Sequence, residues 1–334
     1  MIISELDKII NYGIDNNASD IHLEPKEEHL HLRYRIDGIM QKEIKIEKKL
    51  QQPLTSRIKI LVNLDIAESR LPQDGRTNHC NVDLRVSTIP TLFGEKVVMR
   101  ILKKNQTLPS LDELGMEKNE LIEYRKLIAK RSGIILVSGP TGSGKTTTLY
   151  ATLKELNAPQ NNIVTIEDPI EYVFQDINQT QVNNKTGLTF ARGLRSILRQ
   201  DPDIIFIGEI RDLETAQIAV QAALTGHLVL ATIHTQDAIS SICRLIDMGI
   251  KNYLVSATLL GTVSQRLLRK TSGGRTAVFE VFLLNEEVKE IINKKYSKTN
   301  ILREANFITL AQNAQELLKS NVVGKEEIYR VLGN

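Results

Sequence analysis

The apolar and polar residues of the first hundred positions follow two different spacings. Residues 2–16 carry isoleucine and leucine at helical intervals, which predicts an amphipathic helix. Four later stretches alternate apolar and polar residues as half-buried strands do: DIHLEP, HLHLRYRIDG, VDLRVSTIP and EKVVMRIL. A segment that starts at a proline, PLTSRIKILVNLDIAE, has helical spacing and lies among them. The pattern predicts a small α+β domain over residues 1–103.

The pattern changes after the segment KKNQTLPSLDELG, whose lysines, proline and glycine predict a linker at residues 104–112. Beyond it, helical patterns alternate with apolar runs of strand length: GIILVSG, NIVTIEDP, DIIFIGE and HLVLATIHT. Near-continuous apolar strands are typical of a parallel sheet that helices cover on both faces, which predicts an α/β core over residues 113–271. From residue 272, leucine, isoleucine, glutamate and lysine at helical spacing predict a mainly helical C-terminal region that extends to residue 334.

The composition is ordinary for a globular protein, with 41% hydrophobic and 25% charged residues among 334. The longest apolar runs fall short of the roughly 18 residues that a membrane span needs, and the first residues, MIISELDKII, include acids where a signal peptide is basic. We therefore expect a cytoplasmic protein with peripheral membrane contact. The 43 basic and 40 acidic residues nearly balance, which gives no electrostatic reason to expect direct nucleic-acid binding. The two cysteines, Cys80 and Cys243, are too few for a four-cysteine zinc site.

Residues 139–146 match the phosphate-loop pattern GxxxxGK[ST] between a predicted strand and a predicted helix. Glycines let the backbone turn its N–H groups toward an anion, and the helix N-terminus adds a partial positive charge. Lys145 is expected to reach the β/γ-phosphates and the Thr146 hydroxyl to coordinate Mg²⁺, so the expected cofactors are ATP and Mg²⁺. The predicted nucleotide site comprises Gly139, Pro140, Thr141, Gly142, Ser143, Gly144, Lys145, Thr146 and Thr147.

Hydrolysis also needs a carboxylate that orients or deprotonates the attacking water. Glu209 follows the apolar run IIFI and Gly208, at the end of a predicted strand, where ligands bind in open α/β sheets. The stretch IVTIEDPIEYVF places Glu167, Asp168 and Glu171 after another apolar run. The pattern does not rank these three acids. Glu209 is therefore the first candidate for the catalytic acid.

Two histidines flank a further apolar run. LTGHLVLATIHT places His227 before it and His234 after it. The end of this run resembles the polar sensor strand of motor ATPases, which can feel the γ-phosphate, and we expect a sensor role for both histidines. No other histidine or cysteine lies at metal-ligand spacing, so we do not expect either to bind a metal.

Four stretches together carry a family resemblance. GPTGSGKTTTL, TIEDPIEY, DPDIIFIGEIRD and TGHLVLATIHT resemble, in this order, the Walker A, Asp-box, Walker B and His-box motifs of the type II/type IV secretion ATPases. The resemblance extends upstream through ASDIHLEP, LRYRIDG, LPQDGR and LRVSTIPTLFGEKVVMR. It implies a RecA-like P-loop core with a mainly parallel sheet, a small α+β (PAS-like) N-terminal domain and a helical C-terminal part. The family's Walker B motif has a glycine before its glutamate, as Gly208 stands before Glu209 here.

The resemblance also implies roles and partners. Glu209 would be the catalytic acid and the Asp-box acids would support metal and water, Glu171 joining Thr146 as a Mg²⁺ ligand. The protein would form a homo-hexamer that powers type II secretion pseudopilus or type IV pilus assembly. It would dock on an inner-membrane platform protein and lie peripheral to the inner membrane. Binding energy would move the N-terminal domain against the core, with a hinge at residues 104–112.

Arginines complete the implied site. In such motors the small N-terminal domain of one subunit packs on the nucleotide face of its neighbour and donates basic residues. Arg85 and Arg100 match those positions, and Arg76 is a further candidate. Arg195 and Arg199, in GLRSILRQDPD, match basic positions near the γ-phosphate. An arginine supplied in trans is worth about 10³–10⁵ in rate, so hydrolysis would depend on ring assembly.

The chain departs from many family members at one point. QRLLRKTSGGRTAVFEV runs directly from the QRL segment to the FEV segment, where those members carry a four-cysteine zinc module, so we expect no zinc. We also expect no long N-terminal docking domain ahead of residue 1. Two alternatives remain open. A DNA-handling motor of the conjugation or competence kind would need a basic pore with stacking aromatics, although aromatics are 4% of residues. A non-catalytic scaffold would switch on ATP occupancy alone.

Overall fold

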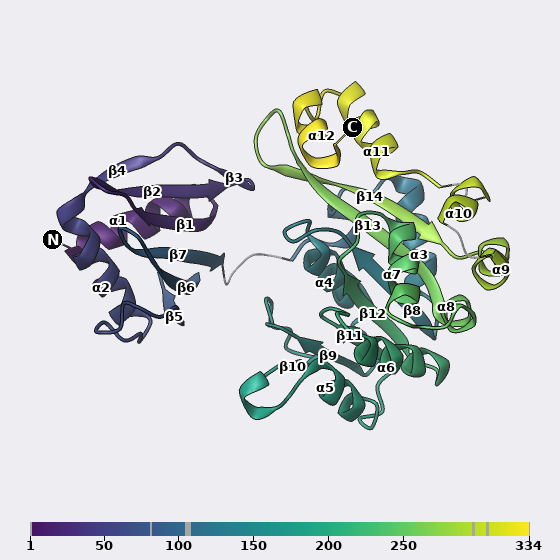
Figure 1. The fold of residues 1–334 in the computed structure, drawn as a ribbon. Helices are drawn as coiled ribbons and strands as arrows, with labels where there is room; N and C mark the ends of the chain where they lie inside the picture. The colour runs from purple at the N-terminus through teal and green to yellow at the C-terminus, as the bar shows by residue number, and fades with distance from the viewer. Residues whose placement is uncertain (1, 81, 104–107, 296–297, 305–306, 334) are drawn as a thin grey trace. The chain divides into compact units, whose positions relative to one another are not determined.

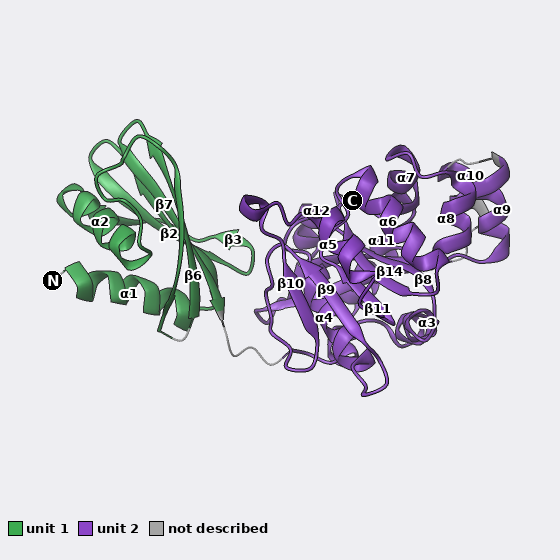
Figure 2. Ribbon diagram, turned by 90° about the horizontal axis from the view of Figure 1, so that it is seen from below, with its two compact units in different colours: residues 1–107 green, residues 108–334 purple. Residues whose placement is uncertain are grey.

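The computed structural model describes residues 2–80, 82–103, 108–295, 298–304 and 307–333. The chain forms two compact units, residues 1–107 and 108–334, which Figure 2 draws in different colours. Residues 104–107, the first part of the predicted linker and hinge, lie outside the described residues. Leu108 and Leu111 are buried in a core cluster of the second unit. The remainder of the predicted linker therefore belongs to that unit.

An antiparallel sheet and two helices make up the first unit (Figure 1). The strand order is β3-β2-β1-β7-β6-β5, and β4 also pairs with β2. The elements are α1 (Ile2–Asp15), β1 (Ala18–Pro25), β2 (His29–Ile36), β3 (Ile39–Met40), β4 (Ile44–Glu47), a 3₁₀ turn (Lys48–Leu50), α2 (Gln51–Leu61), β5 (Gln73–His79), β6 (Val82–Thr91) and β7 (Gly94–Lys103).

The period-two pattern of the strands separates the two faces of this sheet. In β2, Leu30, Leu32 and Tyr34 are buried, whereas the intervening Arg33 and Arg35 are partly exposed. The buried face packs against apolar residues of α1 and α2 in one core cluster. Successive side chains of a strand point to opposite faces, so the charged residues gather on the face away from the helices. The small α+β domain has the arrangement that the sequence predicts.

The second unit is an α/β core built on seven strands in the order β10-β9-β11-β12-β8-β13-β14. All neighbouring pairs are parallel except β13 and β14. Its first elements are a 3₁₀ turn (Leu111–Glu113), α3 (Lys118–Ile128), β8 (Gly133–Ser138), α4 (Lys145–Leu156), β9 (Ile163–Glu167), β10 (Asn178–Gln181), a second 3₁₀ turn (Asn184–Thr186), α5 (Phe190–Ile197), β11 (Ile204–Ile207) and α6 (Leu213–Leu224). Its later elements are β12 (Leu228–Ile233), α7 (Ala238–Asp247), α8 (Asn252–Thr258), β13 (Leu259–Arg269), β14 (Arg275–Leu283), α9 (Glu286–Lys295), α10 (Lys298–Glu304), α11 (Leu310–Lys319) and α12 (Lys325–Leu332).

Both faces of this sheet are covered, which explains the near-continuous apolar runs. In β11, Ile204 and Phe206 belong to the core cluster that α3 and α4 share, and Ile205 and Ile207 to the cluster on the other face. Figure 1 shows helices on both sides of the strands. The mainly parallel P-loop core predicted from the sequence is confirmed.

One strand lies where the sequence analysis expects helices. Residues 275–283 form β14, which pairs antiparallel with β13 along its length. The turn between them is closed by the Lys270 N–H, which donates to the Gly274 carbonyl. α11 and α12 then pack on this hairpin through Leu310, Ala314 and Ile328. The helical C-terminal part thus begins after β14, at Glu286.

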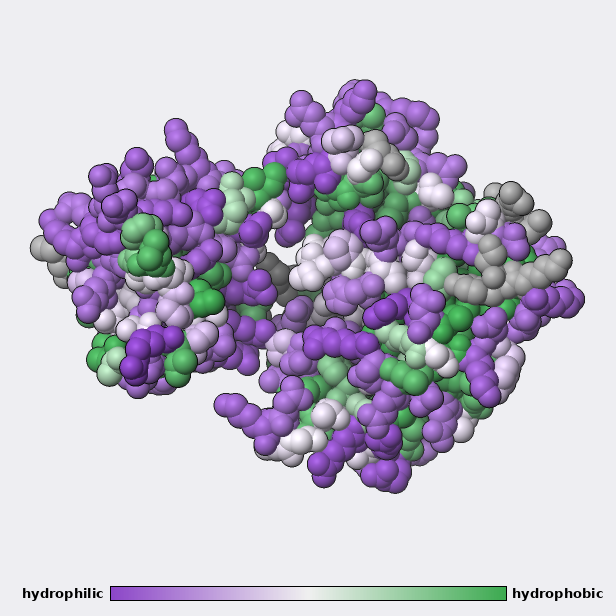
Figure 3. Space-filling view, in the orientation of Figure 1, coloured by the Kyte–Doolittle hydropathy of each residue, from purple (hydrophilic) through white to green (hydrophobic). Residues whose placement is uncertain are grey.

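The surface shown in Figure 3 is that of an ordinary globular protein, as the composition predicts. The face in Figure 3 is mostly hydrophilic, with apolar residues in smaller patches. Among the described residues, no helix combines the length and the apolar character that crossing a membrane requires.

Candidate active site

The loop between β8 and α4 has the backbone conformation that an anion-binding loop needs. Gly139, Gly142 and Gly144 have φ of +146°, +79° and +91°, a region that other residues rarely adopt. A Cβ atom at Gly139 would lie 2.6 Å from the backbone oxygen of Gln265, and one at Gly144 would lie 2.7 Å from its Nε2. Gln265, on β13, therefore fixes the space that the loop can occupy. The buried Ser143 hydroxyl has no hydrogen-bond partner among the described residues, so it could bind a phosphate oxygen.

Lys145 begins α4 and is 8% exposed. Its Nζ donates to the carbonyls of Gly139 and Pro140, at 2.8 and 3.0 Å. Burial lowers the pKa of Lys145 to about 8, and the charges of Glu209 and Glu171 act in the opposite direction. The ammonium thus rests on the loop's own carbonyls, and a phosphate would supply the opposite charge that they lack. These residues fit the triphosphate of ATP.

Glu209 reaches the same edge of the sheet as Lys145. It follows β11, and β8 and β11 both lie parallel to β12, so the carboxyl ends of the strands lie together. The Glu209 side chain is 13% exposed and pairs with the Arg211 guanidinium. Its other oxygen lies 3.8 Å from Nε2 of His234. Placement at the P-loop edge is what a water-activating acid requires.

Gly208 keeps β11 close to β9. Its N–H donates to the Ile166 carbonyl at 2.7 Å, and its carbonyl accepts a hydrogen bond from Thr232 on β12. A Cβ atom here would lie 3.2 Å from the Cα atom of Glu167 and 3.3 Å from the Ile166 oxygen. Backbone atoms of a strand inside a sheet cannot move far to make room for a Cβ atom. A larger residue before Glu209 would therefore push the strand end away from β9.

The three acids of the Asp-box segment, residues 165–172, have different surroundings. Glu167 is 2% exposed and accepts hydrogen bonds from Thr165, Tyr150 and Gln179. Asp168 and Glu171 are exposed. Three internal donors leave Glu167 little capacity for water or metal, so the geometry does not favour the catalytic role expected for it.

The charge of Glu171 is the one of the three that acts on Lys145, whereas the charge of Asp168 acts on Arg211. Among the described residues, no group of three or more histidine, cysteine, aspartate and glutamate side chains could hold a metal ion. A Mg²⁺ ion that enters with ATP needs few protein ligands, because phosphate oxygens and waters supply the others. Thr146 is half-buried in the first turn of α4 and Glu171 is exposed, and the two remain the predicted Mg²⁺ ligands.

The two histidines lie at opposite edges of the sheet. His234 follows β12 and faces Glu209; burial and the charge of Lys145 lower its pKa, while Glu209 raises it. His227 precedes β12, and its carbonyl accepts the N–H of Gly133, the first residue of β8. The ring of His227 instead contacts the Ala222 carbonyl at 2.8 Å, at the end of α6. The placement fits a sensor role for His234 and does not support one for His227 within its own chain.

Comparisons with known proteins identify the family of the chain. The sequence profile of the type II/IV secretion system protein family matches residues 1–330. The type II secretion system ATPase E of Vibrio cholerae is 49% identical over 377 residues, which cover 99% of this chain and 75% of that protein. The chain belongs to the type II/IV secretion system protein family.

Solved structures show the same fold. The pilus retraction motor PilT with bound ADP is 31% identical and has a TM-score of 0.72, over 97% of this chain and 96% of its own. The ATPase DotB of Legionella pneumophila has a TM-score of 0.80 at 22% identity, over 99% of this chain and 95% of its own, and shows the fold alone. The predicted family is confirmed, and this member of it is an ATPase.

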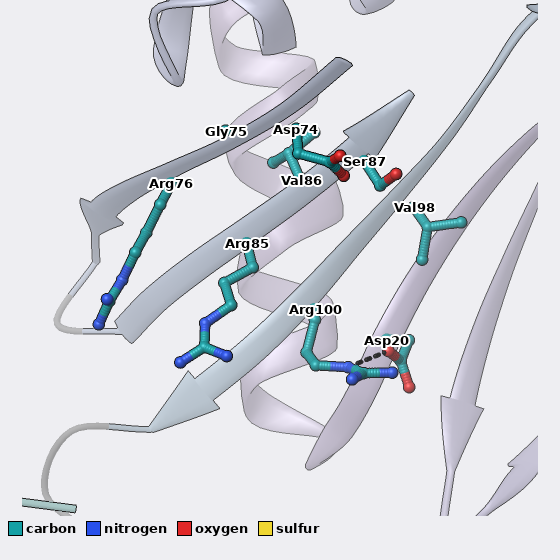
Figure 4. A pocket seen from close by; sticks show the side chains of 9 residues that line it. All are labelled: Asp20, Asp74, Gly75, Arg76, Arg85, Val86, Ser87, Val98 and Arg100. Carbon is teal, nitrogen blue, oxygen red and sulfur yellow. Dashed lines mark hydrogen bonds and ion pairs between the residues drawn. The ribbon is translucent and has the colours of Figure 1, made fainter. Parts of the chain in front are cut away.

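Three arginines of the first unit of this secretion ATPase lie in a row across neighbouring strands. Arg76, Arg85 and Arg100 are paired directly across β5, β6 and β7. Figure 4 shows their side chains on the same side of the sheet, lining a pocket of about 560 Å³. Arg100 donates to Asp20 at 2.9 Å, and Arg76 and Arg85 approach Asp83 at 2.7 and 3.9 Å. Like charges directly opposite one another are destabilising, so this row is a feature that an anionic ligand would stabilise.

Arg195 and Arg199 lie elsewhere in the second unit. The Arg195 guanidinium pairs with Glu214, in the first turn of α6, at 2.6 Å. Arg199 follows α5 and donates to the Arg195 carbonyl. The next residue, Gln200, contacts Asn162, directly before β9, so Arg199 lies at the edge opposite to the P-loop. The geometry does not place Arg199 at the γ-phosphate of its own chain.

Three supporting residues escape sequence reasoning. Gln265 accepts a hydrogen bond from Thr148 at 2.7 Å beneath the P-loop. Arg266 donates to the carbonyls of Gln265 and Gln236, and so joins the floor of the P-loop to the loop after His234. Tyr150 contacts the Asp-box segment. Their partners are distant in sequence, and the one available signal is that Gln265 and Arg266 belong to the QRL segment.

The contacts of Gly208 predict the effect of enlarging it. Gly208→Ala should lower kcat roughly tenfold, because a shift of a few tenths of an ångström misplaces Glu209 relative to the P-loop. ATP turnover under saturating nucleotide measures this. Gly324→Ala is the matched control, since a Cβ atom there meets nothing within 4 Å. Equal turnover of Gly208→Ala and wild type would show that the close approach of β9 has no part in catalysis.

Substitutions of the two histidines should have different effects on ATP turnover in the same assay. His234→Ala should lower kcat by about tenfold to a hundredfold, because it removes the polar side chain that faces Glu209. His227→Ala should leave kcat unchanged and affect thermal stability alone. Loss of turnover in His227→Ala at unchanged melting temperature would contradict this assignment.

Proposed function

We propose that this protein is a Mg²⁺-dependent, ring-forming ATPase motor that powers assembly of a type II secretion pseudopilus or a type IV pilus. The observation that carries the proposal is that Lys145 and Glu209 lie at one edge of the sheet, while the backbone of Glu171 is hydrogen-bonded to Tyr150 on the helix that begins at Lys145. A cation that binds phosphate and carboxylates that can serve water and metal are the parts that phosphoryl transfer needs. The family supports secretion or pilus service, and 49% identity to the type II secretion ATPase E of Vibrio cholerae supports the assembly branch.

The chain's own residues suggest how hydrolysis proceeds. Lys145 exchanges its two loop carbonyls for phosphate oxygens and neutralises charge that develops on them. Glu209 accepts a proton from a water that attacks the γ-phosphorus in line with the leaving oxygen. His234 lies next to Glu209 and is placed to respond when the γ-phosphate is lost. Mg²⁺, held by Thr146 and Glu171, would neutralise phosphate charge.

A neighbouring subunit would complete the site with the arginine row. Arg85 and Arg100 lie in register on adjacent strands and line one pocket, which supports their action as a pair on an anion. Asp20 and Asp83 hold them in the absence of that anion. The ring would be a homo-hexamer docked on an inner-membrane platform protein, and coupling would move one unit of the chain against the other. We propose no direct nucleic-acid ligand.

Two substitutions separate this function from a nucleotide-switched scaffold. Glu209→Gln keeps the size of the side chain and removes the base, so kcat should fall by about 10²–10⁴-fold while ATP still binds. Lys145→Ala should abolish ATP binding. Turnover and nucleotide affinity are measured on the same preparations. If Glu209→Gln supports wild-type turnover, the protein is not the motor proposed here, and DNA-stimulated turnover would favour a DNA-handling motor instead.

Mixing two inactive variants tests donation in trans. Arg85→Ala/Arg100→Ala subunits keep the acid, and Glu209→Gln subunits keep the arginines. In an equimolar mixed ring, about a quarter of the interfaces pair an intact acid with intact arginines, so turnover should recover toward that fraction. The control mixes the arginine variant with Lys145→Ala/Glu209→Gln/Arg85→Ala/Arg100→Ala subunits. Turnover that stays at the level of this control would show that the arginines do not act across an interface.

A further inference from the structure

A tyrosine hydroxyl joins the P-loop helix to the Asp-box segment. Tyr150 lies on α4, five residues after Lys145, and is 2% exposed. Its hydroxyl donates to Oε2 of Glu167 and accepts the backbone N–H of Glu171 at 3.0 Å. One side chain thus contacts two of the three Asp-box acids, one through its carboxylate and the other through its backbone.

The surroundings of Tyr150 hold its ring in place. The ring packs edge-on against Phe174 and Phe206, with centroid separations of 5.6 and 5.9 Å. Phe206 belongs to β11, two residues before Gly208, and Phe174 follows the Asp-box segment. The tyrosine therefore packs between the helix that carries Lys145, the strand that leads to Glu209, and the segment that carries Glu171.

The direction of both hydrogen bonds is defined by their partners. Burial, followed by the charge of Glu167, raises the pKa of Tyr150, so the hydroxyl keeps its proton and donates it to Glu167. The other donors to Glu167, Thr165 and Gln179, bind its second oxygen, Oε1. The oxygen lone pair of the hydroxyl is then free to accept the Glu171 N–H.

We propose that Tyr150 is a positioning residue for hydrolysis, which fixes the backbone at Glu171 to the P-loop helix and so limits where the Glu171 carboxylate can lie. This role rests on the proposed ATPase function. Because α4 is a continuous helix, Tyr150 and Lys145 keep a fixed separation of about 7.5 Å along its axis. A movement of the P-loop helix when nucleotide binds or leaves is therefore transmitted to the Asp-box segment. Glu167 serves as the anchor of this contact and does not need to touch substrate.

Tyr150→Phe removes the hydroxyl and keeps the ring, so it separates the two hydrogen bonds from the packing. We expect kcat to fall by about tenfold to a hundredfold, because a hydrogen bond to a charged group is lost and Glu171 is released. The affinity for ATP should stay near that of the wild type, since Lys145 and the loop glycines are untouched. The variant is measured as the full chain, in steady-state and single-turnover assays.

Tyr124→Phe is the matched control. Tyr124, on α3, is fully buried, and its hydroxyl contacts that of Thr152 at 2.6 Å; Thr152 lies on α4, the helix that also carries Tyr150. Removal of that hydroxyl costs one buried hydrogen bond between α3 and α4, and the contact does not involve the Asp-box segment. Its kcat should change by less than about threefold. Equal losses of turnover in the two variants would show that Tyr150 acts through general stability, and would overturn the inference.

A second pair of measurements tests the route through Glu171. If Tyr150 acts by placing this residue, Tyr150→Phe/Glu171→Gln should turn over no more slowly than Glu171→Gln. If the two residues act independently, the fold-losses of turnover in the two single variants should multiply in the double variant. Hydrogen exchange gives a readout that needs no catalysis: the Glu171 amide should exchange at least about tenfold faster in Tyr150→Phe and not in Tyr124→Phe. Unchanged protection at Glu171 would contradict the inference even if turnover fell. Loss of the proposed function itself would appear differently, as wild-type turnover that does not require Glu209.

Discussion

The buried ammonium of Lys145 is the charge around which the nucleotide site is arranged. It is 8% exposed, and its direct partners are two carbonyls of its own loop. Carbonyl dipoles solvate an ammonium less completely than water does, which is why burial lowers the pKa of Lys145 to about 8. The loop is therefore built for an anion. The positive φ angles of the loop glycines follow from the same requirement, and so does the Ser143 hydroxyl, which has no hydrogen-bond partner in the part of the chain that the structure describes.

Glu209, Glu171 and Glu167 have different surroundings, which suit each carboxylate to a different role. Glu209 is attached to the end of a central strand and stands beside Arg211 and His234. Glu171 lies on an exposed segment whose backbone is tied to α4 by Tyr150. Glu167 is enclosed by donors and serves that tie. Because Glu209 follows a strand and Glu171 lies on a separate segment, the position of Glu171 can change without a movement of Glu209. This arrangement suits an enzyme that must couple hydrolysis to movement.

Much of this could be predicted from the sequence, since apolar runs define the parallel strands and the glycine spacing defines the P-loop. The family resemblance predicted a glycine before Glu209. The structure adds the physical reason, because a Cβ atom at Gly208 would crowd the backbone of β9. The roles of residues that contact partners distant in sequence could not be predicted. His227 and His234 look alike in sequence because they flank the same apolar run, yet they lie at opposite ends of the strand β12 that this run forms. Glu167 shows the same limit, because nothing local reveals that Tyr150 and Gln179 enclose it.

The proposed mechanism depends on one requirement: the edge bearing Lys145 and Glu209 hydrolyses ATP efficiently when arginines of a second copy complete it. Turnover per subunit, followed across a dilution series with sedimentation on the same samples, tests it most directly. We expect turnover per subunit to fall by about 10³-fold or more as rings dissociate into single chains, in proportion to the assembled fraction. Full turnover by a preparation that sediments entirely as single chains would contradict it.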